Sequence, residues 1–313
     1  MSFLKPKDII EQGDTVILYL NANLMHAIEA NPTIVNKKGE TIENVFQTSF
    51  GALKVRSIIG TPYGSRIELS KGGWGIVLQP NPTLWTQTLP HRTQIVYSPD
   101  ISMIIFQLEI RPGSVVVESG TGSGSLSHFI LNAVKPTGQL HTFDFHEARA
   151  NQARDEFQRH GLGGFVHVYH RDVCQNGFSQ DLNGIADAVM LDLPAPQQAV
   201  PHAVKVLKTT GGRFCSFSPC IEQSQRCCVA LHENGFTDIQ SMEILQQEYI
   251  VKTKSMNVME FGFLKEEKPE VPPGEKIKTP KETRKILSSS LPPTLPGHTG
   301  YLTFATLPPE YAR

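Results

Sequence analysis

The stretch Val115-Val-Val-Glu-Ser-Gly-Thr-Gly-Ser-Gly-Ser-Leu126 decides the fold of this chain. A short β-branched run from Ser114 to Glu118 leads into a turn with glycine at alternate positions, and an apolar-periodic segment follows it. This order predicts a strand, a tight turn and a helix. The glycines leave room for a ligand to approach the turn, and the helix N-terminus offers free N–H groups to an anionic group.

The spacing of the glycines separates two kinds of cofactor site. A dinucleotide-binding turn, Gly-x-Gly-x-x-Gly, that begins at Gly120 requires glycine at position 125, where the chain has Ser125. The observed pattern is Gly-x-Gly-x-Gly after the acidic Glu118, which resembles the first motif of S-adenosylmethionine-dependent methyltransferases. On this stretch alone, a turn that binds nothing remains an alternative.

The composition of the 313-residue chain is that of a globular protein with room for two domains. The net charge of −1 means that overall charge does not attract a nucleic acid, so a local basic face or a partner would have to do so. The five cysteines include no Cys-x-x-Cys pair and are expected to be reduced thiols, and we expect no metal site. No apolar run approaches the ~20 residues of a membrane span, and the first residues lack a signal-peptide core. These features predict a soluble protein of the cytosol or nucleus that does not contact membranes.

Residues 1–88 are expected to form a small all-β domain. Four short strand candidates are separated by turn sequences, at 15–20, 24–30, 65–69 and 75–78. This region contains the basic residues Lys54, Arg56, Arg66 and Lys71. Such residues are typical of a solvated face, and a nucleic-acid-binding surface is the second interpretation. Pro80, Pro82 and Pro90 mark the boundary with the next domain.

Residues 89–313 alternate short apolar strands with amphipathic helices. Strands are expected at 114–118, 140–145, 166–170, 188–193 and 213–217, and helices at 101–108, 147–160, 199–207 and 220–234. This alternation predicts an α/β fold with a doubly wound parallel sheet. Two further strands, one from about Thr237 into Tyr249-Ile-Val and one at 297–306, would make a mixed seven-stranded sheet with one antiparallel member. Between them we expect a flexible charged insertion at 263–296.

Aspartates end three of these strands. Asp144, Asp172 and Asp192 follow the second, third and fourth strands, and the carboxyl ends of parallel strands meet at the sheet edge where ligands bind. A carboxylate that accepts ribose hydroxyls is expected ~20 residues after the glycine turn, and Asp144 lies near that separation. Asp172, with the Val173 backbone, could hold an adenine edge. The alternatives are a helix N-cap for Asp144 and turn positions for Asp172 and Asp192.

Five motifs are specific when taken together. They are Pro90-His-Arg-Thr-Gln-Ile-Val-Tyr-Ser98, Glu118-Ser-Gly-Thr-Gly-Ser-Gly-Ser125, Asp192-Leu-Pro-Ala-Pro196, Gly212-Arg-Phe-Cys-Ser-Phe-Ser-Pro-Cys-Ile-Glu-Gln223 and Gly297-His-Thr-Gly-Tyr-Leu-Thr-Phe-Ala-Thr306. Their combination resembles the catalytic subunits of eukaryotic tRNA (adenine-N1)-methyltransferases over nearly the whole chain. The resemblance implies a Rossmann-like class I methyltransferase domain.

The resemblance also implies an activity and an assembly. The expected reaction is methylation of adenosine 58 in the T-loop of tRNA, with S-adenosyl-L-methionine as the methyl donor. The expected assembly is a heterotetramer of two catalytic subunits with two non-catalytic, homologous, tRNA-binding subunits. A nuclear location is implied too, with the lysines between 276 and 285 as support.

Site residues follow from the matched positions and from the glycine turn. The cofactor is expected near Val96, Gly120, Gly122, Ser123, Gly124, Ser125, Asp144, Arg149, Asp172, Val173 and Asp192. The RNA is expected near Gln94, Tyr97, Ser98, Leu191, Pro194, Ser216, Ser218, Pro219, Glu222, Gln223 and Thr299. The family pattern leads us to expect an aromatic residue after Pro196, where this chain has Gln197.

Asp192 is the residue that we expect to carry the chemistry. Pro194 and Pro196 stiffen the loop that follows it and would hold its carboxylate in place. N1 of adenine attacks the methyl group with its own lone pair, so the enzyme aligns two reactants and excludes water. Asp192 would orient the exocyclic amine and stabilise the cationic product ring. The alternatives are a methyltransferase with a protein or small-molecule acceptor, and a non-catalytic RNA-binding subunit that keeps the fold.

Overall fold

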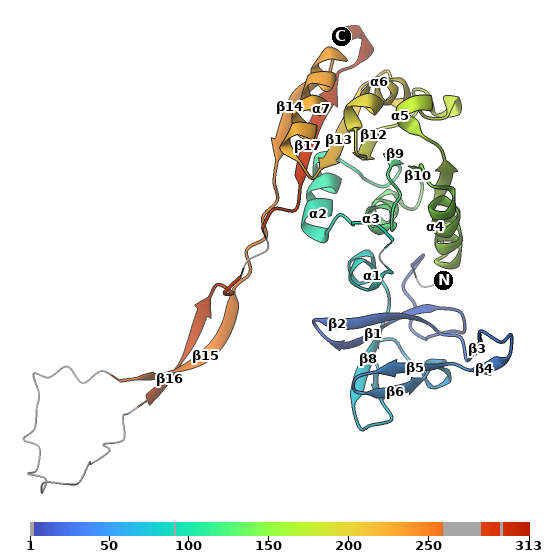
Figure 1. The fold of residues 1–313 in the computed structure, drawn as a ribbon, viewed down its shortest axis with the longest axis vertical. Coiled ribbons are helices and arrows are strands. Elements are labelled where there is room, and N and C mark those ends of the chain that lie inside the picture. Colours follow the sequence, from blue (N-terminus) through green and yellow to red (C-terminus); the bar gives the residue numbers. More distant parts are fainter. Residues whose placement is uncertain (1–2, 91, 259–282, 295–296) are drawn as a thin grey trace, which may run out of the picture. The chain divides into compact units, whose positions relative to one another are not determined.

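The computed structural model describes residues 3–90, 92–258, 283–294 and 297–313. The chain divides into two compact units, the first made of 1–244 with 299–313 and the second of 245–298. Figure 1 shows their helices and strands along the chain. Within the described ranges, no helix has the length and apolar character needed to cross a membrane.

The first unit begins with small antiparallel sheets. Four strands pair in the order β2 (Leu24–Glu29), β1 (Thr15–Asn21), β8 (Trp74–Leu78) and β7 (Arg66–Glu68), and two hairpins accompany them, β3 (Thr33–Val35) with β4 (Thr41–Glu43) and β5 (Val45–Thr48) with β6 (Gly51–Lys54). Val16, Leu18 and Val77 are fully buried in one apolar cluster of this region. The predicted strands are therefore confirmed in this region.

The helix α1 (Pro82–Thr88) lies inside the range expected to be all-β. Asn81 caps it, because its side-chain oxygen accepts a hydrogen bond from the Leu84 N–H at 2.8 Å, and Pro82 fits the first helical position. The prolines that suggested a plain boundary thus begin a helix. α1 contacts β1, β2 and α3 (Ser125–Val134), so it joins the small sheets to the rest of the unit.

A mixed seven-stranded sheet forms the centre of the first unit. Its order is β11 (Val166–His170), β10 (Gln139–Asp144), β9 (Val115–Ser119), β12 (Ala188–Asp192), β13 (Gly212–Ser218), β17 (Tyr301–Leu307) and β14 (Thr237–Met242). The first five strands are parallel, and β17 runs antiparallel to both β13 and β14. The predicted α/β fold and its antiparallel member are confirmed.

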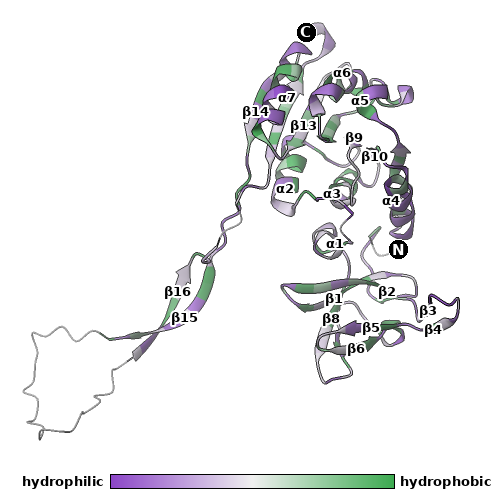
Figure 2. Cartoon of the chain, in the orientation of Figure 1, coloured by the Kyte–Doolittle hydropathy of each residue, from purple (hydrophilic) through white to green (hydrophobic). Residues whose placement is uncertain are grey.

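Helices cover both faces of this sheet. Successive residues of β9 show this, because Val116 and Val117 belong to two different apolar clusters. The first cluster includes residues of α2 (Ser98–Gln107), α3 and α4 (Glu147–Arg159), and the second includes residues of α5 (Val173–Asn176), α6 (Pro196–Val206) and α7 (Ile221–Glu233). Figure 2 shows α4 as largely hydrophilic, in agreement with its narrow stripe of buried apolar residues, Ala150, Ala153 and Phe157.

The second unit contains a two-stranded antiparallel sheet. β15 (Ile250–Asn257) pairs with β16 (Thr283–Ser290) over eight residues, from Ile250 opposite Ser290 to Asn257 opposite Thr283. Part of the insertion expected at 263–296 is therefore a strand, and residues 263–282 of it lie outside the described residues. The basic residues and serines of β16 resemble linker composition, but β15 supplies hydrogen-bond partners along one edge of this strand. The strand expected to run from Thr237 into Tyr249 is divided, since β14 ends at Met242.

Candidate active site

The glycine turn joins the carboxyl end of β9 to α3. Gly120, Gly122 and Gly124 have φ values of 101°, 53° and 77°, a region that suits glycine. A Cβ atom at Gly120 would lie 2.2 Å from the backbone oxygen of Asp192. The ends of β9 and β12 therefore approach each other so closely that only glycine fits at position 120.

A cavity of about 350 Å³ opens beside this turn. Gly120, Asp144, Asp172 and Asp192 line it together, from the carboxyl ends of four neighbouring strands. The remaining lining residues are Phe145, His146, Arg149, Cys174, Leu193, Pro194 and Ala195. The structure thus brings the three predicted aspartates to one cavity, as the strand ends led us to expect.

Asp144 has a buried, fully engaged carboxylate. It accepts hydrogen bonds from the N–H of Gly122 at 3.1 Å and of His146 at 2.8 Å, and Arg149 forms an ion pair with it at 2.9 Å. The N-cap residue of α4 is His146, two positions after Asp144, so the N-cap alternative for Asp144 is not realised. These partners hold Asp144 in one orientation toward the cavity and the glycine turn.

Asp172 is the N-cap of the short helix α5. Its Oδ1 accepts hydrogen bonds from the N–H groups of Cys174 at 3.0 Å and Gln175 at 3.2 Å. Asp172 therefore has a local structural role, close to the turn position given as its alternative. Its Oδ2 stays available to the cavity. The side chain of Val173 is buried in the core, so only its backbone could contact a ligand.

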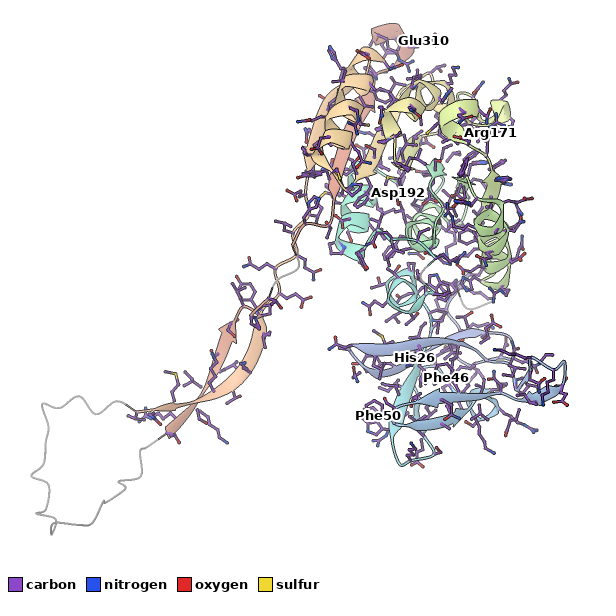
Figure 3. The ribbon with its side chains drawn as sticks, viewed as in Figure 1. His26, Phe46, Phe50, Arg171, Asp192 and Glu310 are labelled. Carbon is purple, nitrogen blue, oxygen red and sulfur yellow. The ribbon has the colours of Figure 1, made fainter. Side chains whose placement is uncertain are left out.

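Asp192 differs from the other two aspartates. It ends β12 at the cavity, and its carboxylate has no hydrogen-bond partner in the part of the chain that the structure describes. Burial raises the pKa of Asp192 to about 7, because the charged form loses its hydration. The position is labelled in Figure 3. The site therefore contains one carboxylate that no group among the described residues neutralises or orients.

Glu118 is a buried carboxyl group that the sequence reading left without a role. Its Oε2 accepts hydrogen bonds from Ser127 Oγ at 2.6 Å and from Thr142 Oγ1 at 2.7 Å. Burial, reinforced by the charges of Asp192 and Asp144, raises its pKa to about 7 against the opposing effect of the two hydroxyls. Glu118 therefore ties together β9, α3 and β10 directly behind the glycine turn.

Six predicted cofactor residues do not line the cavity: Val96, Gly122, Ser123, Gly124, Ser125 and Val173. Ser123, Ser125 and Val96 instead bond to, or belong to, the segment that precedes α2. Ser123 Oγ accepts hydrogen bonds from the N–H groups of Arg92 at 2.9 Å and Thr93 at 3.1 Å. Ser125 Oγ donates to the Val96 carbonyl oxygen at 3.1 Å. All three predicted residues are buried, and their bonds attach segment 92–96 to the turn.

The predicted RNA residues form a mixed set. Leu191, Ser216 and Ser218 are fully buried, so their side chains shape the site from within the sheet. The exposed members are Gln94, Tyr97, Pro194, Pro219, Glu222 and Thr299, and Ser98 and Gln223 are partly exposed. Gln223 Nε2 donates to the Pro194 carbonyl oxygen at 2.9 Å, and Thr299 Oγ1 donates to Asp100 at 3.3 Å. The first bond connects two predicted segments, and the second attaches Thr299 to α2.

Two further positions bear on the site. The ring of Phe145 follows Asp144 directly, is 62% exposed and lines the cavity. Its signal in the sequence was an aromatic residue in the loop after a strand-ending aspartate. Gln197 lines a separate groove with Val229 on α7, and its buried Oε1 has no partner among the described residues.

Comparisons with known proteins agree on one family. A family model described as tRNA methyltransferase complex GCD14 subunit matches residues 73–307. The tRNA (adenine(58)-N(1))-methyltransferase catalytic subunit of Candida albicans is 37% identical over 345 residues, covering 99% of this chain and 100% of that protein. The catalytic subunit of the same description from Dictyostelium discoideum is 38% identical over 331 residues, covering 98% and 99%.

Solved structures share the fold at lower identity. A SAM-dependent O-methyltransferase from Thermotoga maritima has a TM-score of 0.72 at 24% identity, covering 96% of this chain and 95% of that chain. The tRNA (m1A58) methyltransferase of Aquifex aeolicus has a TM-score of 0.67 at 20% identity, covering 96% and 98%. The seven-stranded sheet and the small N-terminal sheets are thus found together in other proteins.

Proposed function

This chain belongs to the tRNA methyltransferase complex GCD14 subunit family, and on that premise we propose that it transfers the methyl group of S-adenosylmethionine to N1 of adenosine 58 in tRNA. The observation that carries the proposal is the arrangement at the sheet edge. A glycine turn, a fully engaged Asp144 and an unpartnered Asp192 line one cavity. A non-catalytic relative of the fold would have no use for the half-buried carboxylate of Asp192, which has no described hydrogen-bond partner and costs stability.

The residues that line the cavity fit an adenosyl ligand. The glycine turn presents no side chains, Asp144 presents a carboxylate for ribose hydroxyls, and Phe145 presents an exposed ring against which a base can stack. S-adenosylmethionine supplies an electrophilic methyl group when it is bound. Asp144, Arg149 and the turn would hold it, and Asp172 with the Val173 backbone would meet the adenine edge.

Asp192 acts on the other reactant. Adenine N1 needs no base in order to attack, and the ring becomes positively charged as the bond forms. A carboxylate that accepts a hydrogen bond from the exocyclic amine orients the ring and stabilises this charge. Because no described protein group bonds to Asp192, its hydrogen-bonding capacity is free for the target base. The base must first leave its stacked position in the T-loop, as in other base-modifying enzymes.

We further propose that the chain works with a non-catalytic tRNA-binding subunit in a heterotetramer of two plus two. A net charge of −1 supports the need for a partner that supplies phosphate contacts. The second unit supports it independently. An isolated pair of strands is marginally stable in water. The two-stranded sheet of this unit also exposes five large apolar side chains, Ile250, Val251, Met256, Ile286 and Leu287.

A nuclear location is part of the proposal. It is supported by the lysines at 276, 278, 281 and 285 in the sequence. A fluorescent fusion of the full chain should accumulate in nuclei, and replacing these four lysines with glutamine should shift it toward the cytosol.

One experiment tests the activity directly. The complex of this chain with its partner subunit is incubated with tritiated donor and an unmodified tRNA transcript, and the methylated nucleoside is identified by mass spectrometry. We expect 1-methyladenosine at position 58 only, and no product from a transcript with guanosine at that position. Methyl incorporation into the guanosine transcript, or into protein, would overturn the assignment of the acceptor.

A further inference from the structure

A chain of buried polar contacts lies behind the glycine turn, outside the cavity. The Arg92 backbone N–H donates to Ser123 Oγ at 2.9 Å, and its guanidinium donates to the Ser123 carbonyl oxygen at 3.4 Å. The same guanidinium nitrogen donates to Glu156 Oε2 at 2.5 Å. The side chains of Arg92 and Glu156 are only 14% and 6% exposed. Arg92 therefore links the middle of the turn to α4.

A second contact holds the next residue of the turn. His128 Nδ1 lies 2.6 Å from the Gly124 carbonyl oxygen, which can only accept, so this nitrogen carries the proton. His128 Nε2 then accepts from His160 Nδ1 at 2.9 Å. Burial lowers the pKa of His128 to about 4 and that of His160 to about 2, so both rings are neutral donors and acceptors.

The cluster of His128, Glu156 and His160 contains residue types that bind metals, with candidate ligand atoms within 4.8 Å of one another. Its hydrogen bonds favour another interpretation. The Nε2 lone pair of His128 is used by His160, and the positive charge beside Glu156 is already the guanidinium of Arg92. The cluster is therefore a hydrogen-bonded support and its geometry does not suit a cation.

Both supports come from one helix. Glu156 lies in the last turn of α4 and His160 is its C-cap residue, whereas Arg149 in the first turns of α4 pairs with Asp144. α4 thus reaches the turn at Ser123 and Gly124 from one end and the carboxylate of Asp144 from the other. The turn itself contains three glycines and has little stiffness of its own.

We propose that Arg92 and Glu156 are positioning residues for the methyl donor: they fix the backbone of the glycine turn through Ser123 without touching the ligand. The inference rests on the proposed function, because it concerns the same donor site. Fixing the turn before binding removes the entropy cost of ordering it on binding. The expected signature is a change in donor affinity at an unchanged maximal rate.

The test uses the complex with its partner subunit and three variants. Arg92→Gln removes both guanidinium bonds and should raise the KM for the donor about tenfold, with kcat within twofold of wild type. Glu156→Gln keeps the size of the side chain and one oxygen acceptor, and it should raise the KM for the donor about threefold. The donor KM of Arg92→Lys should lie between those of Arg92→Gln and wild type, because a lysine can keep only one of the two bonds.

The matched control is Arg154→Gln. Arg154 lies on the same helix and is exposed, and its guanidinium donates to Asn151 Oδ1 at 2.7 Å and to the Val168 carbonyl oxygen at 2.8 Å. Its donor KM should equal that of wild type. Affinity for S-adenosylhomocysteine, measured by calorimetry, should follow the same order as KM in all variants.

Two results would overturn the proposal. If Arg92→Gln and Glu156→Gln lower the melting temperature but leave donor KM within twofold, the pair has a purely structural role. If kcat falls while donor KM is unchanged, the pair acts on the acceptor. Should Arg92→Gln fail to fold, Glu156→Gln decides the matter alone. Calorimetry with S-adenosylhomocysteine needs no tRNA, so a failure of the proposed acceptor would be seen separately.

Discussion

The ends of β10 and β12 face the same cavity but are built in opposite ways. At the end of β10, Asp144 is held by two backbone N–H groups and by Arg149. At the end of β12, Asp192 is held by no described group, and its pKa is raised to about 7. We interpret the contrast, on the proposed function, as a donor side that is complete before binding and an acceptor side where the substrate would be the last partner of Asp192.

The largest effect should come from the unpartnered carboxylate. Asp192→Asn should lower kcat by about 10³-fold, because charge stabilisation of the product ring is lost. Its melting temperature should equal or exceed that of wild type, since a half-buried carboxylate without a described partner is removed. Thermal unfolding and methyl transfer by the complex would be measured together, with the exposed Asp155→Asn on α4 as the control. Turnover within tenfold of wild type would remove the proposed role.

The engaged carboxylate should respond differently. Asp144→Asn should raise donor KM about 30-fold and also lower the melting temperature, because it breaks the pair with Arg149 and the bond from the Gly122 N–H. Calorimetry with S-adenosylhomocysteine and thermal unfolding give the two values. An Asp144→Asn protein with unchanged stability would show that the two strand ends are less different than their bonds indicate.

The pH dependence offers a finer distinction. Asp192 must be ionised to stabilise a cation, so kcat/KM should rise about tenfold per pH unit below a midpoint near 7. The pKa of Asp192 is higher in the folded protein than the value of about 3.8 in the unfolded chain. Asp192 therefore contributes folding stability that is fully present below pH 3.8 and is lost as the pH rises through about 7. Glu118 has a similar pKa, so Glu118→Gln should keep the activity profile if Asp192 is responsible. If kcat/KM of Glu118→Gln did not change with pH, the titrating group would be Glu118 and not Asp192.

The smallest expected effect lies on the donor side. Phe145→Ala should raise donor KM about fivefold, because an exposed ring that could stack against adenine is lost. Phe145→Leu, which keeps an apolar side chain, should lose less. A rise in the KM for tRNA with unchanged donor KM would place this ring on the acceptor side.

The sequence was sufficient for the parts of the site that lie at strand ends. A short apolar strand followed by Gly120 or by Asp144, Asp172 or Asp192 is a local pattern, and parallel strands bring such ends to one edge. Strand β16 was missed because its basic residues and serines resemble a linker, and α1 because its prolines resemble a boundary. The decisive partner of β16 is β15, which lies elsewhere in the sequence, whereas the cap of α1 is the adjacent Asn81, a local signal that the prolines obscured.

The supports behind the turn could not be predicted in the same way. Arg92 and Glu156 are 64 positions apart, and His128 and His160 are 32 positions apart. Their contacts depend on the rotation of α3 and α4 about their axes and on the path of the segment before α2. Neither is set by the hydrophobic period alone, which fixes a helix face only broadly. Glu118 was visible as an acidic residue before the turn, but its burial and its two hydroxyl partners were not.

The place of β17 in the sheet has a consequence for biosynthesis. β14 pairs only with β17 within the described sheet, and β17 also covers the free edge of β13, yet it follows every other strand in the sequence. On the ribosome, therefore, an apolar strand edge at β13 stays open until residues 301–307 have emerged. Such an edge is a template for pairing with other chains. A nascent chain that stalls within the preceding segment would present that edge to its neighbours, so early capture by a chaperone or by the partner subunit should matter more for this protein than for one whose sheet closes in sequence order.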